Sequence, residues 1–145
     1  LEQELDRLAA GARRHGLALS AVMARADEPA SESHPQRQRP RTAGIQRELA
    51  YLLAAVRRTD DFAAVWDERT FVILLPVTTL DGARQFAERL RVVVNAAPLR
   101  CADELVPVTL SCACAEVGEP PETVLATLEL AVLSVQTGGG DRTWG

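Results

Sequence analysis

The sequence contains no lysine, because its sixteen basic residues are all arginine. This excludes Schiff-base catalysis and the lysine of a phosphate-binding P-loop. No apolar run approaches the roughly 20 residues that span a bilayer, so this domain is not expected to contact a membrane directly. Three cysteines, an odd number, with no secretory signal favour a reducing, cytoplasmic location over a disulfide framework.

Length and charge narrow the class of protein further. A chain of 145 residues with 47% hydrophobic residues fits one globular domain over residues 1–145. Because it starts at Leu1 without a Met or targeting segment, we expect a piece, the C-terminal part, of a longer protein that can be membrane-anchored elsewhere. The net charge of −4 argues against a nucleic-acid polymer as partner. A small anionic ligand held by a few arginines is compatible with it.

Hydrophobic periodicity predicts an α+β fold. Between two predicted strands, residues 27–44 contain three prolines and no periodicity, and we expect a flexible loop there. After a first helix that ends at Gly16, the order is β-α-β-β-α-β followed by a final helix, which is a ferredoxin-like pattern with an antiparallel central sheet flanked by helices. The expected elements are helices near 1–15, 45–58, 79–94 and 121–137, and strands at 17–24, 62–66, 71–75 and 106–117.

Two groups of residues invite a catalytic or metal-binding interpretation, and both have a simpler one. Cys112 and Cys114 lie on one face of a predicted strand, but Cys101 and two distant histidines do not complete a metal-ligand set, so buried reduced thiols are expected. Asp67 and Glu68 are adjacent in a predicted turn with no third group, so they are expected to be solvated and to have no catalytic role.

Several local sequences together resemble the GGDEF domains of bacterial diguanylate cyclases over nearly the whole chain. The resemblance implies the nucleotidyl-cyclase (GGDEF-type) fold. The similar segments are Arg14-His15-Gly16-Leu17-Ala18-Leu19-Ser20, Phe71-Val72-Ile73-Leu74-Leu75-Pro76, Ala87-Glu88-Arg89-Leu90-Arg91, Val108-Thr109-Leu110-Ser111 and Gly140-Asp141-Arg142.

The resemblance fails at the positions that the family uses for catalysis. In the family, the signature turn Gly-Gly-Asp/Glu-Glu-Phe admits GTP and supplies a metal-binding carboxylate. Here the turn is degenerate, the first metal aspartate is replaced by Arg25 with Asp27 two residues later, and Gln136 stands where a phosphate-contacting lysine is expected. Two-metal phosphoryl transfer needs all its carboxylates, so we expect no enzyme activity, no catalytic residue, no bound metal and no cofactor. The five signature positions read Asp67, Glu68, Arg69, Thr70 and Phe71.

What matches is the family's inhibitory site (I-site), an Arg-x-x-Asp motif that ends five residues before the signature turn. Arg58 and Asp61 stand in this register, and by spacing Arg89 is the further arginine from the neighbouring helix. In the family this site binds cyclic di-GMP, usually as an intercalated dimer. Arginine can read guanine O6 and N7 with its two-pronged guanidinium, and a carboxylate can accept the N–H groups of the other guanine edge.

The resemblance therefore implies a catalytically inactive, cytoplasmic receptor for cyclic di-GMP. It would bind the ligand through Arg58, Asp61 and Arg89 and relay its level, in bacterial signal transduction, to another protein or protomer. The alternative is a ligand-independent scaffold that dimerises or holds a neighbouring domain. A third interpretation, an active cyclase, would need the turn to bind GTP despite Asp67 and Glu68.

Overall fold

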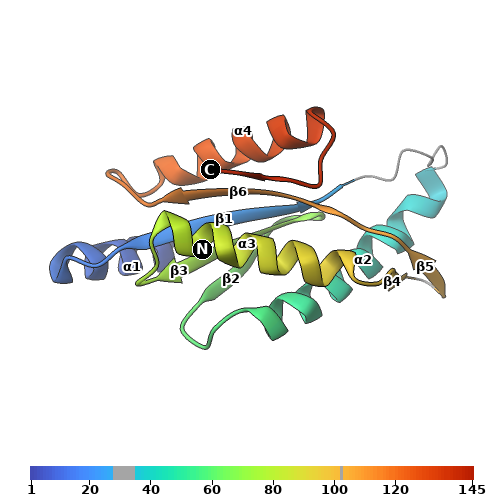
Figure 1. Ribbon diagram of the computed structural model, residues 1–145, viewed down its shortest axis with the longest axis horizontal. Helices are drawn as coiled ribbons and strands as arrows, with labels where there is room; N and C mark the ends of the chain where they lie inside the picture. The colour runs from blue at the N-terminus through green and yellow to red at the C-terminus, as the bar shows by residue number, and fades with distance from the viewer. Residues whose placement is uncertain (28–34, 102) are drawn as a thin grey trace.

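A computed structural model describes residues 1–27, 35–101 and 103–145, and for residues 35–42 only the backbone (Figure 1). The main sheet has five strands in the order β2-β3-β1-β6-β7. The elements are α1 (Glu2–His15), β1 (Leu19–Ala26), α2 (Pro35–Val56), β2 (Phe62–Asp67), β3 (Thr70–Pro76), α3 (Leu80–Asn95), β4 (Leu99–Cys101), β5 (Glu104–Val106), β6 (Leu110–Glu116), α4 (Thr123–Thr137) and β7 (Thr143–Trp144).

The sheet is antiparallel except at one edge. Strand β1 pairs antiparallel with β3 and with β6, and β2 pairs antiparallel with β3. The short C-terminal strand β7 adds to β6 in parallel, which the sequence analysis did not predict. The α+β fold class with a largely antiparallel sheet is therefore confirmed.

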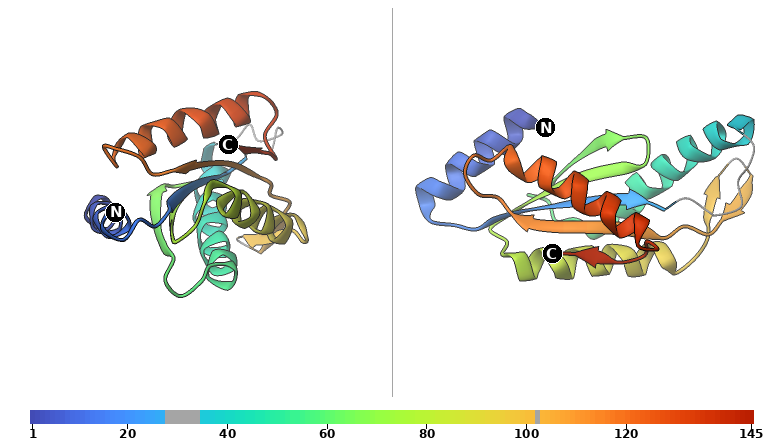
Figure 2. Two further views of the ribbon diagram at one scale, coloured as in Figure 1. Left: turned by 60° about the vertical axis from the view of Figure 1, so that its left-hand side comes forward. Right: turned by 90° about the horizontal axis from the view of Figure 1, so that it is seen from above.

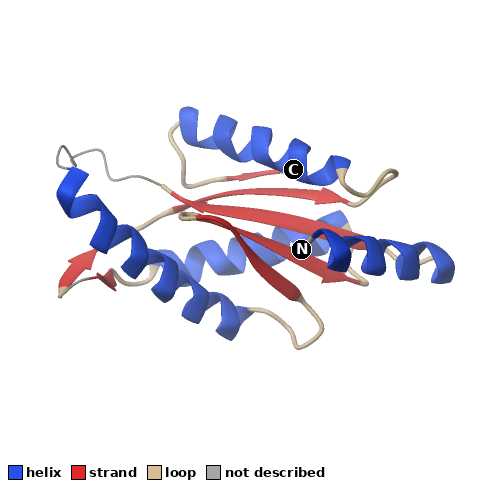
Figure 3. Ribbon diagram, turned by 180° about the vertical axis from the view of Figure 1, so that it is seen from behind, coloured by secondary structure: helices blue, strands red, loops and turns tan. Residues whose placement is uncertain are grey.

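Helices cover both faces of the sheet, as the two views of Figure 2 show. Helices α1 and α4 lie on one face, and α2 and α3 lie on the other, which is also visible from behind in Figure 3. Alternate residues of β1 enter the two cores: Val22 and Ala24 face α2 and α3, whereas Ala21 and Met23 face α1 and α4. A central strand that is buried on both faces has a nearly continuous apolar sequence, and β1 has one.

The structure differs from the predicted loop over residues 27–44. Residues 28–34 lie outside the described residues, but Pro35–Val56 form helix α2, so the second half of the predicted loop is helical. Proline is well suited to the first position of a helix, and the glutamines and arginines that follow are good helix formers even without an apolar stripe. The sequence analysis relied on that stripe, and it becomes visible only from Ile45 onward.

Two further elements were missed or shifted. A two-stranded hairpin of β4 and β5 lies at the opposite end of the molecule from α1 (Figure 1) and packs against α2, whereas β6 begins only at Leu110. The predicted stop of the first helix is confirmed, because Gly16 has the left-handed conformation (φ 64°). Within the described residues, no helix combines the length and apolar character needed to cross a membrane.

Candidate functional site

The predicted Arg-x-x-Asp motif forms a tight turn between α2 and β2. The carboxylate oxygen Oδ2 of Asp61 accepts the backbone N–H of Arg58 at 2.8 Å, and the backbone N–H of Asp61 donates to the Arg58 carbonyl at 3.1 Å. The neighbouring Arg57 donates from Nη1 to the Asp61 carbonyl at 2.8 Å. These bonds within the turn fix where the Arg58 side chain leaves the backbone.

The two side chains of the motif differ sharply in exposure. The Arg58 side chain is 57% exposed, whereas that of Asp61 is fully buried, and Nη2 of Arg58 lies 3.7 Å from Oδ1 of Asp61. No hydrogen-bond donor reaches this Oδ1 from the described residues. A ligand can therefore contact Arg58 directly, whereas the Asp61 carboxylate is inaccessible in this conformation.

Arg58 has a second partner that the sequence analysis did not foresee. Its Nη2 donates to the Thr78 hydroxyl at 2.7 Å, and that hydroxyl donates to the Pro76 carbonyl at 2.9 Å. The Ser20 hydroxyl in turn donates to the Thr78 carbonyl at 2.7 Å. The residue that caps α3 is Thr79, whereas the neighbouring Thr78 is buried and is held by these hydrogen bonds.

Arg58 and Arg89 lie in the same hollow, although they come from different elements. This hollow has a volume of about 340 Å³ and lies where the Arg58 turn meets the first turns of α3. The guanidinium carbon of Arg89 lies 6.0 Å from the centre of the Phe86 ring, at the outer limit for a cation–π contact. The N-terminal end of α3 carries a partial positive charge, which adds to the two arginines. The lining residues are Arg58, Leu75, Val77, Thr78, Thr79, Gly82, Gln85, Phe86 and Arg89.

Two larger hollows have a different character. One of about 500 Å³ lies between α2 and α3 beside Val92, and one of about 510 Å³ lies beside Asp27 and Asn95. Both are lined mainly by apolar side chains. The hollow that holds Arg58 and Arg89 is smaller, but it has the polar lining that an anionic, base-bearing ligand requires.

The turn between β2 and β3 is held by an arginine from β1. Nη1 of Arg25 donates to Oδ2 of Asp67 and to the Thr70 hydroxyl, both at 3.0 Å. The backbone N–H of Arg69 donates to the other Asp67 oxygen at 2.9 Å. Partial burial raises the pKa of Asp67, but the Arg69 N–H, the Thr70 hydroxyl and Arg25 outweigh it and hold this pKa below its usual value. Asp67 is thus part of a structural contact and not a free acid or base.

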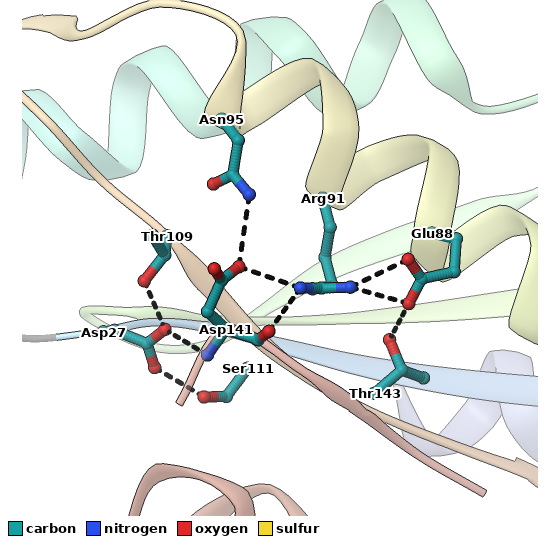
Figure 4. Close-up of polar contacts among 8 residues, drawn as sticks. All are labelled: Asp27, Glu88, Arg91, Asn95, Thr109, Ser111, Asp141 and Thr143. Atoms are coloured by element: carbon teal, nitrogen blue, oxygen red, sulfur yellow. Dashed lines mark hydrogen bonds and ion pairs between the residues drawn. The ribbon is translucent and has the colours of Figure 1, made fainter. Parts of the chain in front are cut away.

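Asp27, the acidic residue near the end of β1, is occupied by contacts within the fold (Figure 4). Its Oδ2 accepts from the Thr109 hydroxyl at 2.6 Å and from the backbone N–H of Asp141 at 2.9 Å. Its Oδ1 accepts from the Ser111 hydroxyl and from Nε2 of Gln136 at 3.3 Å. Both carboxylate oxygens therefore hold the C-terminal segment against the ends of β1 and β6.

Arg91 extends this network across α3 (Figure 4). It forms ion pairs with Glu88 at 2.7 Å and with Asp141 at 2.9 Å, and Asn95 donates to Asp141 at 3.1 Å. The Asn95 amide and Arg91 hold the pKa of Asp141 below its usual range. Sequence reasoning counted Arg91 only as part of a similar segment, because long-range pairs leave no local pattern.

The cysteines are buried and unsuited to act as nucleophiles. Cys101, Cys112 and Cys114 are all buried and reduced, as predicted. Burial raises the pKa of Cys112 strongly and that of Cys114 to about 12, so neither is a thiolate near neutral pH. Across residues 1–27, 35–101 and 103–145, no cluster of three or more His, Cys, Asp or Glu side chains is placed to hold a metal ion.

Comparison with curated proteins finds a diguanylate cyclase and a response regulator among the proteins with similar sequences. The chain is 34% identical over 87 residues to diguanylate cyclase DgcP of Pseudomonas aeruginosa, an alignment that covers 59% of this chain and 13% of DgcP. It is 32% identical over 100 residues to the response regulator PleD of Caulobacter vibrioides, covering 66% of this chain and 22% of PleD. The chain thus spans only a small part of these relatives. No protein-family model matches it.

Solved structures of GGDEF domains share the fold over almost the whole chain. The GGDEF domain of YfiN from Pseudomonas aeruginosa superposes with a TM-score of 0.86 at 19% identity, covering 99% of this chain and 91% of that one. The GGDEF domain of DgcB from Caulobacter crescentus in complex with c-di-GMP gives 0.79 at 22% identity, covering 99% and 86%. Diguanylate cyclase SiaD of Pseudomonas aeruginosa, in complex with its activator SiaC, gives 0.78 at 25% identity, covering 98% and 56%.

The fold thus defines the class of domain. The chain has the GGDEF-domain fold, and its sequence is similar to those of diguanylate cyclases.

Proposed function

We propose that this chain is a catalytically inactive GGDEF domain that binds cyclic di-GMP through Arg58, Asp61 and Arg89. The observation that carries the proposal is that Arg58 and Arg89, from different elements, line one hollow of about 340 Å³. In this proposal, binding changes how the domain associates with another protein or a second protomer.

The chemistry of the hollow suits a nucleotide with guanine bases and phosphates. The exposed Arg58 guanidinium can donate two parallel hydrogen bonds to O6 and N7 of guanine. Arg89, from the middle of α3, can neutralise a phosphate or stack on a base. When Arg58 turns toward the ligand, the Oδ1 atom of Asp61 becomes an acceptor for the guanine N–H groups.

Inactivity follows from the residues at the former catalytic positions. Arg25 and Arg69 bring positive charge to places where the family carries metal-binding carboxylates, and Arg25 is committed to Asp67. Asp27 already accepts hydrogen bonds on both oxygens. Gln136 donates to the Ala26 carbonyl at 3.2 Å, so it does not replace the phosphate-contacting lysine. Without paired carboxylates, the two cations of phosphoryl transfer have no protein ligands.

Relay to a partner is supported by the relatives. Among the similar structures, DgcB is seen in complex with c-di-GMP and SiaD with its activator SiaC. A ligand that bridges two surfaces favours whichever arrangement of domains gives the additional contacts.

The alternative, a ligand-independent scaffold, is favoured by one feature. The Asp61 carboxylate is fully buried and closes the turn, a role that needs no ligand. In this case the motif would persist because it shapes the α2–β2 connection.

Calorimetric titration of cyclic di-GMP, with GTP as the comparison ligand, distinguishes the two functions. We expect the wild-type chain to bind with micromolar or tighter affinity, and Arg58→Ala and Arg89→Ala to lose most of that binding. Arg84→Ala is the matched control, since it removes one positive charge from the same helix at a residue outside the hollow. No binding by the wild-type chain, or equal loss in the control, would support the scaffold.

A further inference from the structure

A valine lies in a strained conformation beside the proposed ligand hollow. Val77, between β3 and α3, has a φ of 52°, in the left-handed region. L-residues avoid this region because Cβ crowds a carbonyl oxygen, and a β-branched residue there is a true outlier. Such strain persists only when the surrounding structure imposes it, and it is concentrated at functional sites.

The neighbours of Val77 impose its conformation. Pro76 pairs with Leu19 at the start of β1, and Thr78 is tied by its carbonyl to Ser20 and by its hydroxyl to Arg58. Gly82 brings the first turn of α3 close to Thr78, because a Cβ there would lie 2.9 Å from the Thr78 methyl group. The chain is therefore fixed on both sides of Val77.

Packing does not account for a valine at this position. The residue is 62% exposed, so its side chain contributes little to the core. It lines the hollow of Arg58 and Arg89 on one side and a smaller hollow of about 180 Å³ next to α1 on the other. Glycine would adopt the same backbone conformation without strain.

The lining of the proposed site shows what the valine can supply. Leu75 and Phe86 also border this hollow, but they are 1% and 3% exposed and turn little surface toward a ligand. Arg58 can recognise a base edge, and Arg89 can bind a phosphate or stack on one face of a base, so the other face of a purine is open to an apolar side chain. Val77 is the exposed apolar side chain among the residues that line this hollow.

We propose that Val77 is a ligand-positioning residue whose isopropyl group packs against the face of a purine base held by Arg58 and Arg89. This inference rests on the proposed function. The strained backbone conformation places the Val77 side chain at the hollow, where it can contact the base.

Val77→Gly tests the inference because it separates stability from binding. Relief of the strained φ should raise Tm by a few degrees. Loss of the apolar contact should weaken the calorimetric Kd for cyclic di-GMP by about three- to tenfold. A residue with a merely structural role would not give these opposite changes.

Two further variants separate the contact from backbone rigidity. Val77→Leu keeps an apolar side chain that is one methylene larger, and because this position is 62% exposed the variant should bind cyclic di-GMP within about twofold of wild type. Val77→Asn tolerates the left-handed conformation but is polar, so it should bind as weakly as Val77→Gly. Leu130→Ala, at an exposed apolar residue of α4 away from the hollow, is the control and should leave Kd unchanged.

Each outcome supports or overturns the inference. If the wild-type chain binds and Val77→Gly binds equally well, or if Val77→Leu binds as weakly as Val77→Gly, the contact is refuted while the receptor function stands. A fall in Tm with Val77→Gly would show a structural role and also refute it. If the wild-type chain does not bind cyclic di-GMP, the proposed function fails first and the inference fails with it.

Discussion

Nη1 of Arg25 lies 3.0 Å from Oδ2 of Asp67, so the end of β1 is joined to the tip of the β2–β3 hairpin by a cation that belongs to the chain. The same nitrogen donates to the Thr70 hydroxyl and thereby contacts both strands of the hairpin. This arrangement gives a physical account of how the turn keeps its shape without the glycines of the family signature.

Removal of the guanidinium should weaken the hairpin without affecting the ligand site. Arg25→Met keeps much of the aliphatic stem but loses both polar contacts. Because the Asp67 side chain is 45% exposed, solvent screens this ion pair, and we expect a loss of about 0.5–1 kcal/mol in the free energy of unfolding. Urea denaturation measures it. Cyclic di-GMP titration of the same variant should match wild type, and a changed affinity would contradict the separation of the two sites.

Incubation with GTP and Mg²⁺ should give no cyclic di-GMP, either with the wild-type chain or with Arg25→Asp. Returning one carboxylate to β1 leaves Arg69 at the metal-binding position of the turn and leaves Asp67 and Glu68 in place of the glycines. Chromatography of the reaction mixture after prolonged incubation is the measurement, with an active diguanylate cyclase as positive control. Product from either chain would overturn the proposed inactivity.

The sequence predicted the fold better than the contacts of the site. The stripes of α1 and α3 and the runs of β1 and β3 each have a period or length that belongs to one kind of element, so their order was readable. The first half of α2 has no apolar stripe, and β4 and β5 have three residues each, too few for a pattern.

For the candidate site too, the spacing of the residues could be predicted from the sequence, but their contacts could not. The spacing of Arg58, Asp61 and Arg89 is readable along the chain, and the structure places both arginines in one hollow. The burial of Asp61 and the tie from Arg58 to Thr78 depend on how β3 passes beneath the turn, which no local spacing encodes. Likewise, the strain at Val77 arises from anchors on both sides of it and not from its own preference.

The stability of the domain should fall in acid through carboxylates with depressed pKa values. Asp141 and Asp67 both have lower pKa values in the folded state, so their ionised forms stabilise the fold above the pKa of the unfolded chain. That contribution is lost as pH falls below about 4 toward the folded-state pKa. The destabilisation caused by Asp141→Asn should therefore be clear at neutral pH and should shrink toward zero in acid.

Urea unfolding at a series of pH values measures this difference. Asp6→Asn, at an exposed position on α1, serves as the control and should cost less than about 0.5 kcal/mol throughout. A cost of Asp141→Asn that stays constant with pH would show that its ionisation is not coupled to folding.

Asp27 should be among the most sensitive positions for stability. Asp27→Ala leaves the Thr109 and Ser111 hydroxyls and the Asp141 N–H without their acceptor, whereas the Gln136 amide keeps its bond to the Ala26 carbonyl. Unpaired polar groups in a partly buried site cost about 1–3 kcal/mol each where water cannot enter, and we expect a total loss of about 2–4 kcal/mol. Ser111→Ala, which removes one donor, should cost about 0.5–1.5 kcal/mol. Denaturant unfolding of both variants tests the ranking, and a smaller loss for Asp27→Ala than for Ser111→Ala would contradict it.

Two glycines in helices should respond in opposite directions to the same substitution. A Cβ at Gly44 in α2 would lie 2.9 Å from Cβ and 3.1 Å from Cα of Cys101, so β4 would have to move. A Cβ at Gly11 in α1 would meet nothing within 4 Å. Alanine is the better helix former by about 1 kcal/mol, a gain that both sites share in principle.

At Gly44 the clash with Cys101 determines whether the substitution stabilises or destabilises the fold. Overpacking against a backbone costs about 1–3 kcal/mol, so Gly44→Ala should be destabilising by up to about 2 kcal/mol after the helix gain, whereas Gly11→Ala should stabilise by about 0.5–1 kcal/mol. Urea denaturation of the pair measures both, and each glycine variant is the control for the other. If both substitutions stabilise, the close approach of α2 to β4 is looser than the 2.9 Å distance implies.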